Sequence, residues 1–214
     1  GIGVDNIDVR AATLAGIIVM NTPGANSVAT AEQAMALMLA VTRHIAKAHA
    51  SLSKGEWKRS SYVGTELMGK TLGIIGFGRI GRLVSQRALA FGMTVLAYDP
   101  FVSEEIAREL NVTLVDLDDL LAGSDYITLH TALVEETEEM INTKTIAQMK
   151  DGVIIIIAAR GKLINDHDLA AGLKSGRVGA AAIDVYRQEP PAPTNPLLEA
   201  PNVLHTPHLG ASTL

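Results

Sequence analysis

The segment over residues 72–99 restricts the fold of this chain more than any other. It begins with an apolar run, 72–75, which leads into Gly76-Phe77-Gly78-Arg79-Ile80-Gly81. A helical pattern of apolar residues follows as far as Gly92, and a second apolar run over 94–98 ends on Asp99. A strand, a glycine turn, a helix, a strand and a terminal acid in this order predict a βαβ unit of the kind that binds a dinucleotide.

Each glycine of this turn has its own physical reason. Gly76 permits the tight turn, Gly78 lets the backbone approach a pyrophosphate, and Gly81 lets the helix pack closely on the strand. The unpaired N–H groups of the helix N-terminus then face the phosphates. Asp99 comes 99 − 78 = 21 residues after the middle glycine, where its carboxylate can accept hydrogen bonds from a ribose. Because a 2′-phosphate there would meet like charge, the sequence favours NAD over NADP.

Strands and helices alternate from residue 70 onward, which predicts an α/β fold with a doubly wound parallel sheet of the Rossmann type. Expected strands cover 126–129, 153–157, 178–183 and the region near 203, and expected helices cover 104–110, 116–121, 143–149 and 166–174.

Upstream of the alternating part, the pattern predicts a short helix over 7–15, a strand over 17–20 and a long helix over 28–52. Ser27 is the expected N-cap of the long helix. That helix is apolar on most faces, so we expect more than one neighbour to bury it.

A polar stretch over 53–69 carries the only tryptophan, Trp57. Two interpretations stay open for it: a surface connector whose tryptophan lies on its own domain, or an arm that anchors a partner subunit.

Composition excludes several classes of function. A net charge of −5 gives no electrostatic footprint for nucleic acid or an anionic membrane, so neither is expected as a partner. The absence of cysteine excludes a disulfide scaffold and a thiolate metal site. No apolar run is long enough to span a bilayer, and no signal peptide is visible, which together favour a cytoplasmic location.

Five polar residues follow directly on predicted strands. Because the carboxyl ends of parallel strands meet at one edge of the sheet, where ligands of such folds bind, we expect these side chains to converge on one site. They are Asp99, Thr131, Arg160, Asp184 and His208.

Three residues near this edge match the needs of hydride transfer from a secondary alcohol to nicotinamide. His208 can act as the base that takes the hydroxyl proton, and Glu189 can pair with it and stabilise its protonated form. Arg160 offers a planar fork for a substrate carboxylate or keto oxygen. The alternative readings are a solvated arginine and an ordinary loop glutamate. His205 and His208 are spaced like a metal pair, but no third ligand has suitable spacing, so no metal is expected.

The chain resembles the D-2-hydroxyacid dehydrogenase family over essentially its whole length, and within it most closely the members that act on 3-phosphoglycerate. The matching stretches are residues 1–8, 21–28, 57–67, 76–81, 98–100, 159–161, 182–191 and 206–213.

The resemblance implies catalytic roles for Arg160, Glu189 and His208, a small 2-hydroxyacid or 2-ketoacid substrate, and NAD as the cofactor. The cofactor contacts that it implies, together with those of the glycine turn, are Gly76, Gly78, Arg79, Ile80, Gly81, Asp99, Thr131, Ala158, Ala159, Arg160, Asp184, His208, Gly210 and Ala211.

The resemblance also implies a domain organisation. Residues 1–20 are expected to be a remnant of the crossover from a substrate domain, and residues 21–214 the NAD-binding domain. The 26–69 region, with 53–69 as its arm, is expected to form a homodimer or homotetramer. Since most of the substrate domain is not in this sequence, we expect this chain to bind NAD but to turn over poorly.

Three positions depart from the family pattern in turns that line the cofactor pocket: Ile157, Lys162 and Ala132. Two alternatives to a family member that acts on 3-phosphoglycerate stay open. One is a glyoxylate or hydroxypyruvate reductase, which shares all of these motifs. The other is an NAD-sensing, corepressor-like binding module.

Overall fold

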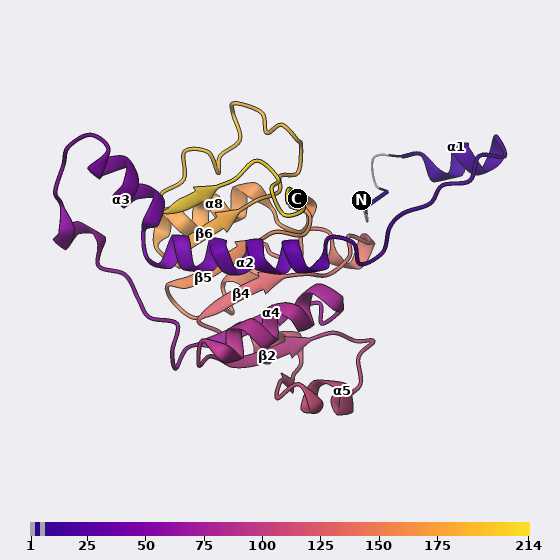
Figure 1. The fold of residues 1–214 in the computed structure, drawn as a ribbon, viewed down its shortest axis with the longest axis horizontal. Helices are drawn as coiled ribbons and strands as arrows, with labels where there is room; N and C mark the ends of the chain where they lie inside the picture. The colour runs from indigo at the N-terminus through magenta and orange to yellow at the C-terminus, as the bar shows by residue number, and fades with distance from the viewer. Residues whose placement is uncertain (1–2, 5–6) are drawn as a thin grey trace.

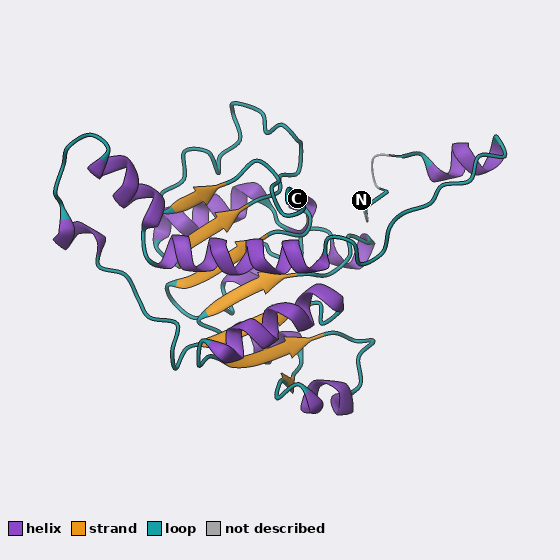
Figure 2. Ribbon diagram, viewed as in Figure 1, coloured by secondary structure: helices purple, strands orange, loops and turns teal. Residues whose placement is uncertain are grey.

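The computed structural model describes residues 3–4 and 7–214. Within these residues, the chain forms a seven-stranded parallel sheet in the order β3-β2-β1-β4-β5-β6-β7. Figure 2 shows its strands in orange with helices packed against them. The strands are β1 (Thr71–Ile75), β2 (Thr94–Tyr98), β3 (Thr113–Leu114), β4 (Tyr126–Leu129), β5 (Val153–Ile157), β6 (Val178–Ile183) and β7 (Val203–His205). The strand order reverses between β1 and β4, and in such sheets ligands bind at the carboxyl ends of the strands beside this point.

Helices cover both faces of the sheet, as parallel crossovers require. One apolar core lies between the sheet and the helices α2 and α4, and the other between the sheet and α6, α7 and α8. The predicted doubly wound fold is therefore confirmed. The helices are α1 (Val9–Leu14), α2 (Ser27–Thr42), α3 (Ile45–Leu52), α4 (Arg79–Ala90), α5 (Glu104–Glu109), α6 (Leu117–Gly123), α7 (Thr143–Ile146) and α8 (Asp166–Ser175), with 3-10 turns at Arg59–Tyr62, Glu135–Thr137 and Gly161–Leu163.

The long helix predicted over 28–52 is wrong, because the structure divides it into α2 and α3. The loop over 63–65 crosses the end of α2, where the Thr65 N–H donates to the Thr42 carbonyl at 3.4 Å. A side chain at Gly64 would lie 2.5 Å from that same oxygen. His44 takes a left-handed φ of 54° and turns the chain into α3. A contact with a segment about twenty residues away therefore decides where the helix ends.

The start of α2 differs in detail from the prediction. Asn26, not Ser27, is the N-cap, and its side chain makes no capping hydrogen bond. Ser27 is the first helical residue and is buried. The predicted burial of this helix by several neighbours is confirmed, because α2 packs against α4, β5, β6 and β7. Figure 1 shows α2 lying across the sheet.

The helix predicted over 143–149 is shorter than expected, since α7 ends at Ile146. The side chain of Arg177 takes up the carbonyl groups at this end. It donates from Nε to the Ile146 carbonyl at 3.2 Å and from Nη2 to the Ala147 and Met149 carbonyls. These bonds satisfy the last carbonyls of the turn without a further helical turn.

The strand predicted over 17–20 is also wrong. These residues form no strand, and the side chains of Ile17, Ile18 and Met20 are exposed. No described strand lies beside them to complete a hydrogen-bonded ladder, and α1 likewise buries no residue. Residues 1–2 and 5–6, which belong to the first matching motif, lie outside the described residues. Figure 1 shows α1 at the opposite side of the molecule from α3.

The segment that follows α3 loops away from the sheet, as Figure 1 shows. Trp57 lies on this loop with 82% of its surface exposed. Most of its side chain is therefore not packed against the rest of the chain, which favours the second of the two interpretations. Among the described residues, no helix is long and apolar enough to cross a membrane.

Candidate active site

The glycine turn after β1 has the geometry that its sequence predicts. Gly76 has a φ of 93°, and a Cβ there would lie 2.5 Å from the Thr131 main-chain nitrogen. A Cβ at Gly81 would lie 2.3 Å from the Gly76 carbonyl oxygen, so α4 can pack on the turn only with glycine here. Gly78 is different, because a Cβ there would meet nothing within 4 Å. Open space beside the Gly78 backbone fits the approach of a pyrophosphate.

Asp99 lies at the carboxyl end of β2 and is bound to the glycine turn. Its Oδ2 accepts the Phe77 N–H at 2.9 Å, and its Oδ1 accepts the Phe101 N–H at 2.9 Å. A carboxylate oxygen can accept two hydrogen bonds, so both oxygens keep capacity for ribose hydroxyls. Asp99 thus holds the turn in place and presents an acid beside it.

Thr131 and Arg79 both lie close to the glycine turn after β1. Thr131 follows β4, and its main chain touches Gly76 as described. Arg79 begins α4, and its Nη1 would lie 3.6 Å from a Cβ at Gly24, in the turn before α2. The N-termini of α2 and α4 therefore both approach the carboxyl edge of the sheet. Ile80, the next predicted contact, is partly buried against the core of α2 and α4.

His130 is a residue of this edge that the sequence did not single out. Its main-chain N–H donates to the Ile75 carbonyl at 2.7 Å, and its Nε2 lies 3.0 Å from Thr128 Oγ1. Its Nδ1 is buried and has no hydrogen-bond partner among the described residues. Burial lowers the pKa of His130 from 6.5 to about 4, so the ring is neutral near pH 7. The only available signal was its place directly after a buried strand.

His208 and Glu189, which the sequence predicts to act as an acid/base pair, are in contact in the structure. His208 Nδ1–H donates to Glu189 Oε2 at 2.6 Å, and both side chains are partly exposed. The other oxygen of this carboxylate, Oε1, accepts the Tyr186 N–H at 3.0 Å. His208 has a left-handed φ of 55°, and its N–H donates to the Asp184 carbonyl at 2.8 Å. Because Nδ1 is engaged, Nε2 is the atom left to exchange a proton with a substrate.

Asp184 lies at the end of β6 and is fully buried. Its carboxylate accepts the Thr206 hydroxyl at 2.6 Å, the Leu209 N–H at 2.8 Å and the Gly210 N–H at 2.8 Å. These are charge-assisted hydrogen bonds in a buried position, so they fix the loop that carries His208. In this structure Asp184 and Gly210 hold the loop, and Ala211, also predicted as a contact, is exposed beside it.

Thr30 is a second residue that the sequence did not indicate. It lies on α2, and its hydroxyl donates to the Gly210 carbonyl at 3.2 Å. Through this bond α2, far away in the sequence, supports the loop of His208. Nothing in the pattern of an apolar helix marks one threonine for this contact.

Arg160 follows β5 after Ala158 and Ala159, and its Nη1 donates to the Ala159 carbonyl at 2.8 Å. The next residue, Gly161, is buried against the peptide between Tyr186 and Arg187. The turn after β6 therefore contacts the segment of Arg160, contains Glu189 and binds the backbone of His208. This one turn therefore contacts or contains each of the three segments that carry the predicted catalytic residues.

The three departures from the family pattern lie in different surroundings. Ile157 is fully buried in β5, paired with Leu129 and Ile183, and serves the core. Lys162 and Ala132 are exposed. None of the three contacts Glu189 or His208 through a hydrogen bond given for the described residues.

A cavity of about 420 Å³ flanks the acid/base pair. It is mainly apolar, and Glu189 and His208 form part of its wall. The other lining residues are Tyr186, Pro190, Pro191, Leu198, His205, Thr206 and Pro207.

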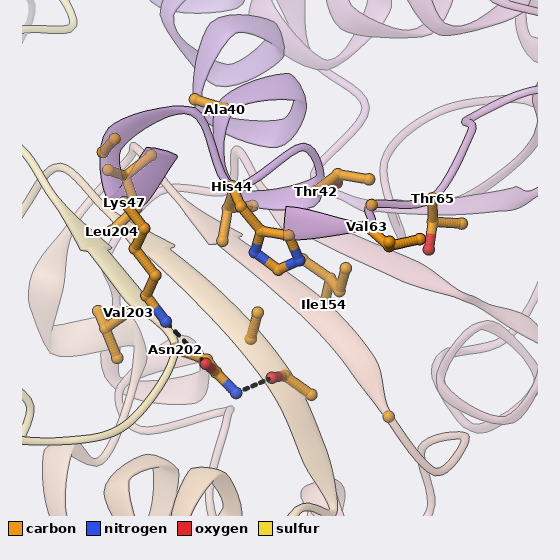
Figure 3. A pocket seen from close by; sticks show the side chains of 16 residues that line it. Ala40, Thr42, His44, Lys47, Val63, Thr65, Ile154, Asn202, Val203 and Leu204 are labelled. Carbon is orange, nitrogen blue, oxygen red and sulfur yellow. Dashed lines mark hydrogen bonds between the residues drawn. The ribbon is translucent and has the colours of Figure 1, made fainter. Parts of the chain in front are cut away.

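A second cavity, of about 200 Å³, lies near the amino ends of β5 and β6, away from the edge that carries the predicted site. Figure 3 shows His44 and Lys47 beside it, with Lys47 Nζ donating to Asn202 Oδ1 at 2.8 Å. None of the predicted site residues lines it. Among the described residues, no group of three His, Asp or Glu is arranged to hold a metal ion.

The parallel sheet, the glycine turn and the acid after β2 define a dinucleotide-binding domain of the Rossmann type. A family model described as "D-isomer specific 2-hydroxyacid dehydrogenase, NAD binding domain" matches residues 35–210. The chain belongs to this family of D-2-hydroxyacid dehydrogenases, and NAD is the cofactor of the matched domain.

Named relatives agree with the family. The chain is 53% identical to a D-3-phosphoglycerate dehydrogenase from Archaeoglobus fulgidus, covering 100% of this chain but 40% of that protein. It is 53% identical to a hydroxypyruvate reductase from Thermotoga maritima, covering 100% of this chain and 69% of that protein. A crystal structure of a glyoxylate reductase from Paecilomyes thermophila matches with a TM-score of 0.90 at 41% identity, covering 100% of this chain and 64% of that one.

Proposed function

We propose that this chain is the cofactor-binding and catalytic part of an NAD-dependent dehydrogenase of D-2-hydroxyacids. The favoured reaction is the oxidation of D-3-phosphoglycerate to 3-phosphohydroxypyruvate, a step of serine biosynthesis in the cytoplasm. The observation that carries the proposal is the 2.6 Å contact between His208 Nδ1 and Glu189 Oε2, at the sheet edge that also holds the glycine turn. The phosphoglycerate substrate is supported by the name of the Archaeoglobus relative, of which this chain spans 40%.

Each of the three catalytic residues has a separate task in this reaction. His208 takes the hydroxyl proton of the substrate at Nε2, because its Nδ1 is bound to Glu189. Glu189 stabilises the imidazolium that results. Arg160 holds the substrate carboxylate and polarises the developing carbonyl. The glycine turn and Asp99 would hold NAD, which would supply the hydride acceptor for the substrate carbon.

The cofactor is proposed to lie along the carboxyl edge of the sheet. Its pyrophosphate would approach Gly78, where the backbone faces open space, and its adenosine ribose would bind Asp99. The remaining proposed contacts are Gly76, Arg79, Ile80, Gly81, Thr131, Ala158, Ala159, Arg160, Asp184, His208, Gly210 and Ala211.

Calorimetric titration of NAD and NADP into the chain tests the cofactor site. We expect the parent chain to bind NAD, and to bind NADP more weakly. The Asp99→Asn variant should lose most of the NAD affinity, so that its affinities for NAD and NADP differ less than those of the parent. Asp116→Asn, at the N-cap of α6, is the matched control for a charge change near the sheet and should leave NAD binding unchanged. If the parent chain binds neither nucleotide, the cofactor site as proposed is wrong.

A glyoxylate or hydroxypyruvate reductase is the second candidate. It is supported by the Thermotoga relative, which is as similar in sequence as the Archaeoglobus one. Comparison of kcat/KM for 3-phosphoglycerate with NAD and for hydroxypyruvate and glyoxylate with NADH separates the two. A large preference for hydroxypyruvate or glyoxylate would replace the first proposal. His208→Gln should abolish turnover of each substrate, because the base is lost in each case.

The 26–69 region is proposed to pair two copies of the chain, with 53–69 as the arm and Trp57 as an anchor. The exposure of Trp57 supports this, since large exposed aromatic side chains are favoured at interfaces. Residues 1–20 are proposed to be the remnant of a crossover from a substrate domain. The exposed apolar side chains of Ile17, Ile18 and Met20 support that proposal, because they have no described neighbour to pack against.

A further inference from the structure

Tyr186 connects the two segments that carry the proposed acid/base pair. Its main-chain N–H donates to Glu189 Oε1 at 3.0 Å. Its phenol hydroxyl is hydrogen-bonded to His205 Nδ1 at 2.7 Å. The two rings are also stacked, with centroids 6.3 Å apart and planes inclined by 21°. His205 ends β7, three residues before His208, so one tyrosine spans the Glu189 turn and the His208 loop.

Packing and the hydrogen bond together fix this arrangement. Tyr186 is buried in the core between the sheet and α6, α7 and α8, whereas His205 is exposed, and both residues line the cavity of about 420 Å³. Burial raises the pKa of Tyr186 to about 12 and lowers the pKa of His205. Both shifts in pKa favour the neutral form of the ring concerned.

Other charged groups near the turn are engaged elsewhere. The guanidinium of Arg187 binds Glu139 at 2.7 Å and Glu138 at 3.1 Å, not Glu189. The Asp184 carboxylate accepts hydrogen bonds from the loop of His208. The Glu189 carboxylate accepts a hydrogen bond from His208 on one oxygen and from the Tyr186 N–H on the other.

We propose that Tyr186 is a positioning residue, which uses its hydroxyl bond to His205 to hold Glu189 and His208 in register. This rests on the proposed function, in which the pair moves a proton. The N–H of Tyr186 orients the carboxylate, and the phenol ties that turn to the strand end from which His208 projects. Loss of the hydroxyl should loosen the 2.6 Å contact without removing either partner.

The test follows the Nδ1–H proton of His208 by NMR in the 214-residue chain labelled with ¹⁵N-histidine. A short bond to a carboxylate gives this proton a strongly downfield, slowly exchanging signal, and His208→Gln identifies it by its loss. Tyr186→Phe keeps the ring and the main-chain N–H, and should move the signal upfield and speed its exchange with water. His205→Leu should do the same, whereas the double variant should add nothing further.

Two further variants separate positioning from general stability. His205→Asn keeps an amide that can donate or accept at the place of Nδ1, and should restore the signal that His205→Leu loses. Tyr62→Phe removes a hydroxyl from the arm and should leave the signal unchanged. If Tyr186→Phe and His205→Leu lower the melting temperature but leave the signal in place, Tyr186 is only structural and the inference is wrong. If one variant does not fold, the other decides by the same criterion.

A different result would contradict the proposed function itself. If the parent chain shows no downfield His208 signal, the pair with Glu189 is not formed in solution. An intact signal that the two variants do not alter contradicts only the role of Tyr186.

Discussion

Gly161 and Tyr186 are in direct main-chain contact: a Cβ built on Gly161 would lie 2.0 Å from the Tyr186 carbonyl carbon. The segment that carries Arg160 therefore rests on the turn that carries Glu189. This contact joins the ends of β5 and β6 and leaves no room for a side chain.

Gly161→Ala is expected to destabilise the chain because backbone atoms on both sides must move. We expect the free energy of unfolding to fall by roughly 3 kcal/mol or more, as for other overpacked sites. Urea unfolding followed by circular dichroism measures the change. Lys162→Ala alters the exposed neighbour and should stay within about 0.5 kcal/mol of the parent. Equal stability of Gly161→Ala and the parent would contradict the contact.

Two glycines of the turn after β1 should respond in opposite ways to alanine. The Cβ that Gly78→Ala adds would meet nothing within 4 Å, and the φ of −75° at this position suits any residue. The fold should therefore be unaffected. NAD affinity should drop by about tenfold or more, because the methyl group occupies the side that a pyrophosphate approaches. Gly81→Ala should lower the free energy of unfolding by roughly 2 kcal/mol or more, since its Cβ would lie 2.3 Å from the Gly76 carbonyl.

Calorimetric titration and urea unfolding on the same two variants separate these effects. A Gly78→Ala chain that binds NAD as well as the parent would place the pyrophosphate elsewhere.

His130 should make the stability of the chain depend on pH. Its pKa is about 4 in the folded chain, below the ordinary 6.5 expected when unfolded, so protons favour the unfolded state. The contribution of the neutral His130 ring to the free energy of unfolding is present above pH 6.5 and is lost as the pH falls toward 4. This contribution is about 3 kcal/mol when complete.

The comparison with His130→Gln isolates this effect from the carboxylates that titrate in the same range. Urea unfolding at a series of pH values should show the parent losing stability faster than the variant between pH 6.5 and 4. Parallel curves would mean that His130 titrates normally in the folded chain.

Trp57→Ala should weaken self-association without unfolding the domain. The side chain is 82% exposed, so its removal costs little within one copy. Sedimentation equilibrium of the parent and variant measures the association constant. We expect the variant to be monomeric at concentrations at which the parent is still associated. Phe101→Ala removes an aromatic residue that is 94% exposed after β2 and serves as the control. A monomeric parent, or equal association of parent and variant, would contradict the arm proposal.

Much of the fold could be predicted because its information is local. The strand over 94–98 and the tight turn at Gly76 follow from side-chain periodicity and from backbone freedom at a glycine. The parallel order followed from the alternation of strands and helices. The convergence of strand ends on one edge then placed His208 and Asp184 correctly near each other.

The incorrect predictions of helix ends and of one strand share one cause. The end of α2 depends on the loop at Gly64, and the end of α7 on Arg177, both of which come from other parts of the chain. The strand expected over 17–20 has the right apolar residues but no described neighbour to pair with. A periodic pattern states what a segment can form, whereas a neighbour decides where it stops.

The sequence by itself determined the class of fold, the glycine turn and the acid that follows β2, and its resemblance to a known family indicated the proposed catalytic residues. The first three depend on backbone conformation and on residues close together in the chain. Only the tertiary structure decided that Thr30 supports the loop of His208, that the Asp184 carboxylate binds that loop, and that Tyr186 and His205 connect the segments of Glu189 and His208. Such contacts join residues that are 19 to 180 positions apart, and they exist only once the packed sheet has fixed where each strand ends.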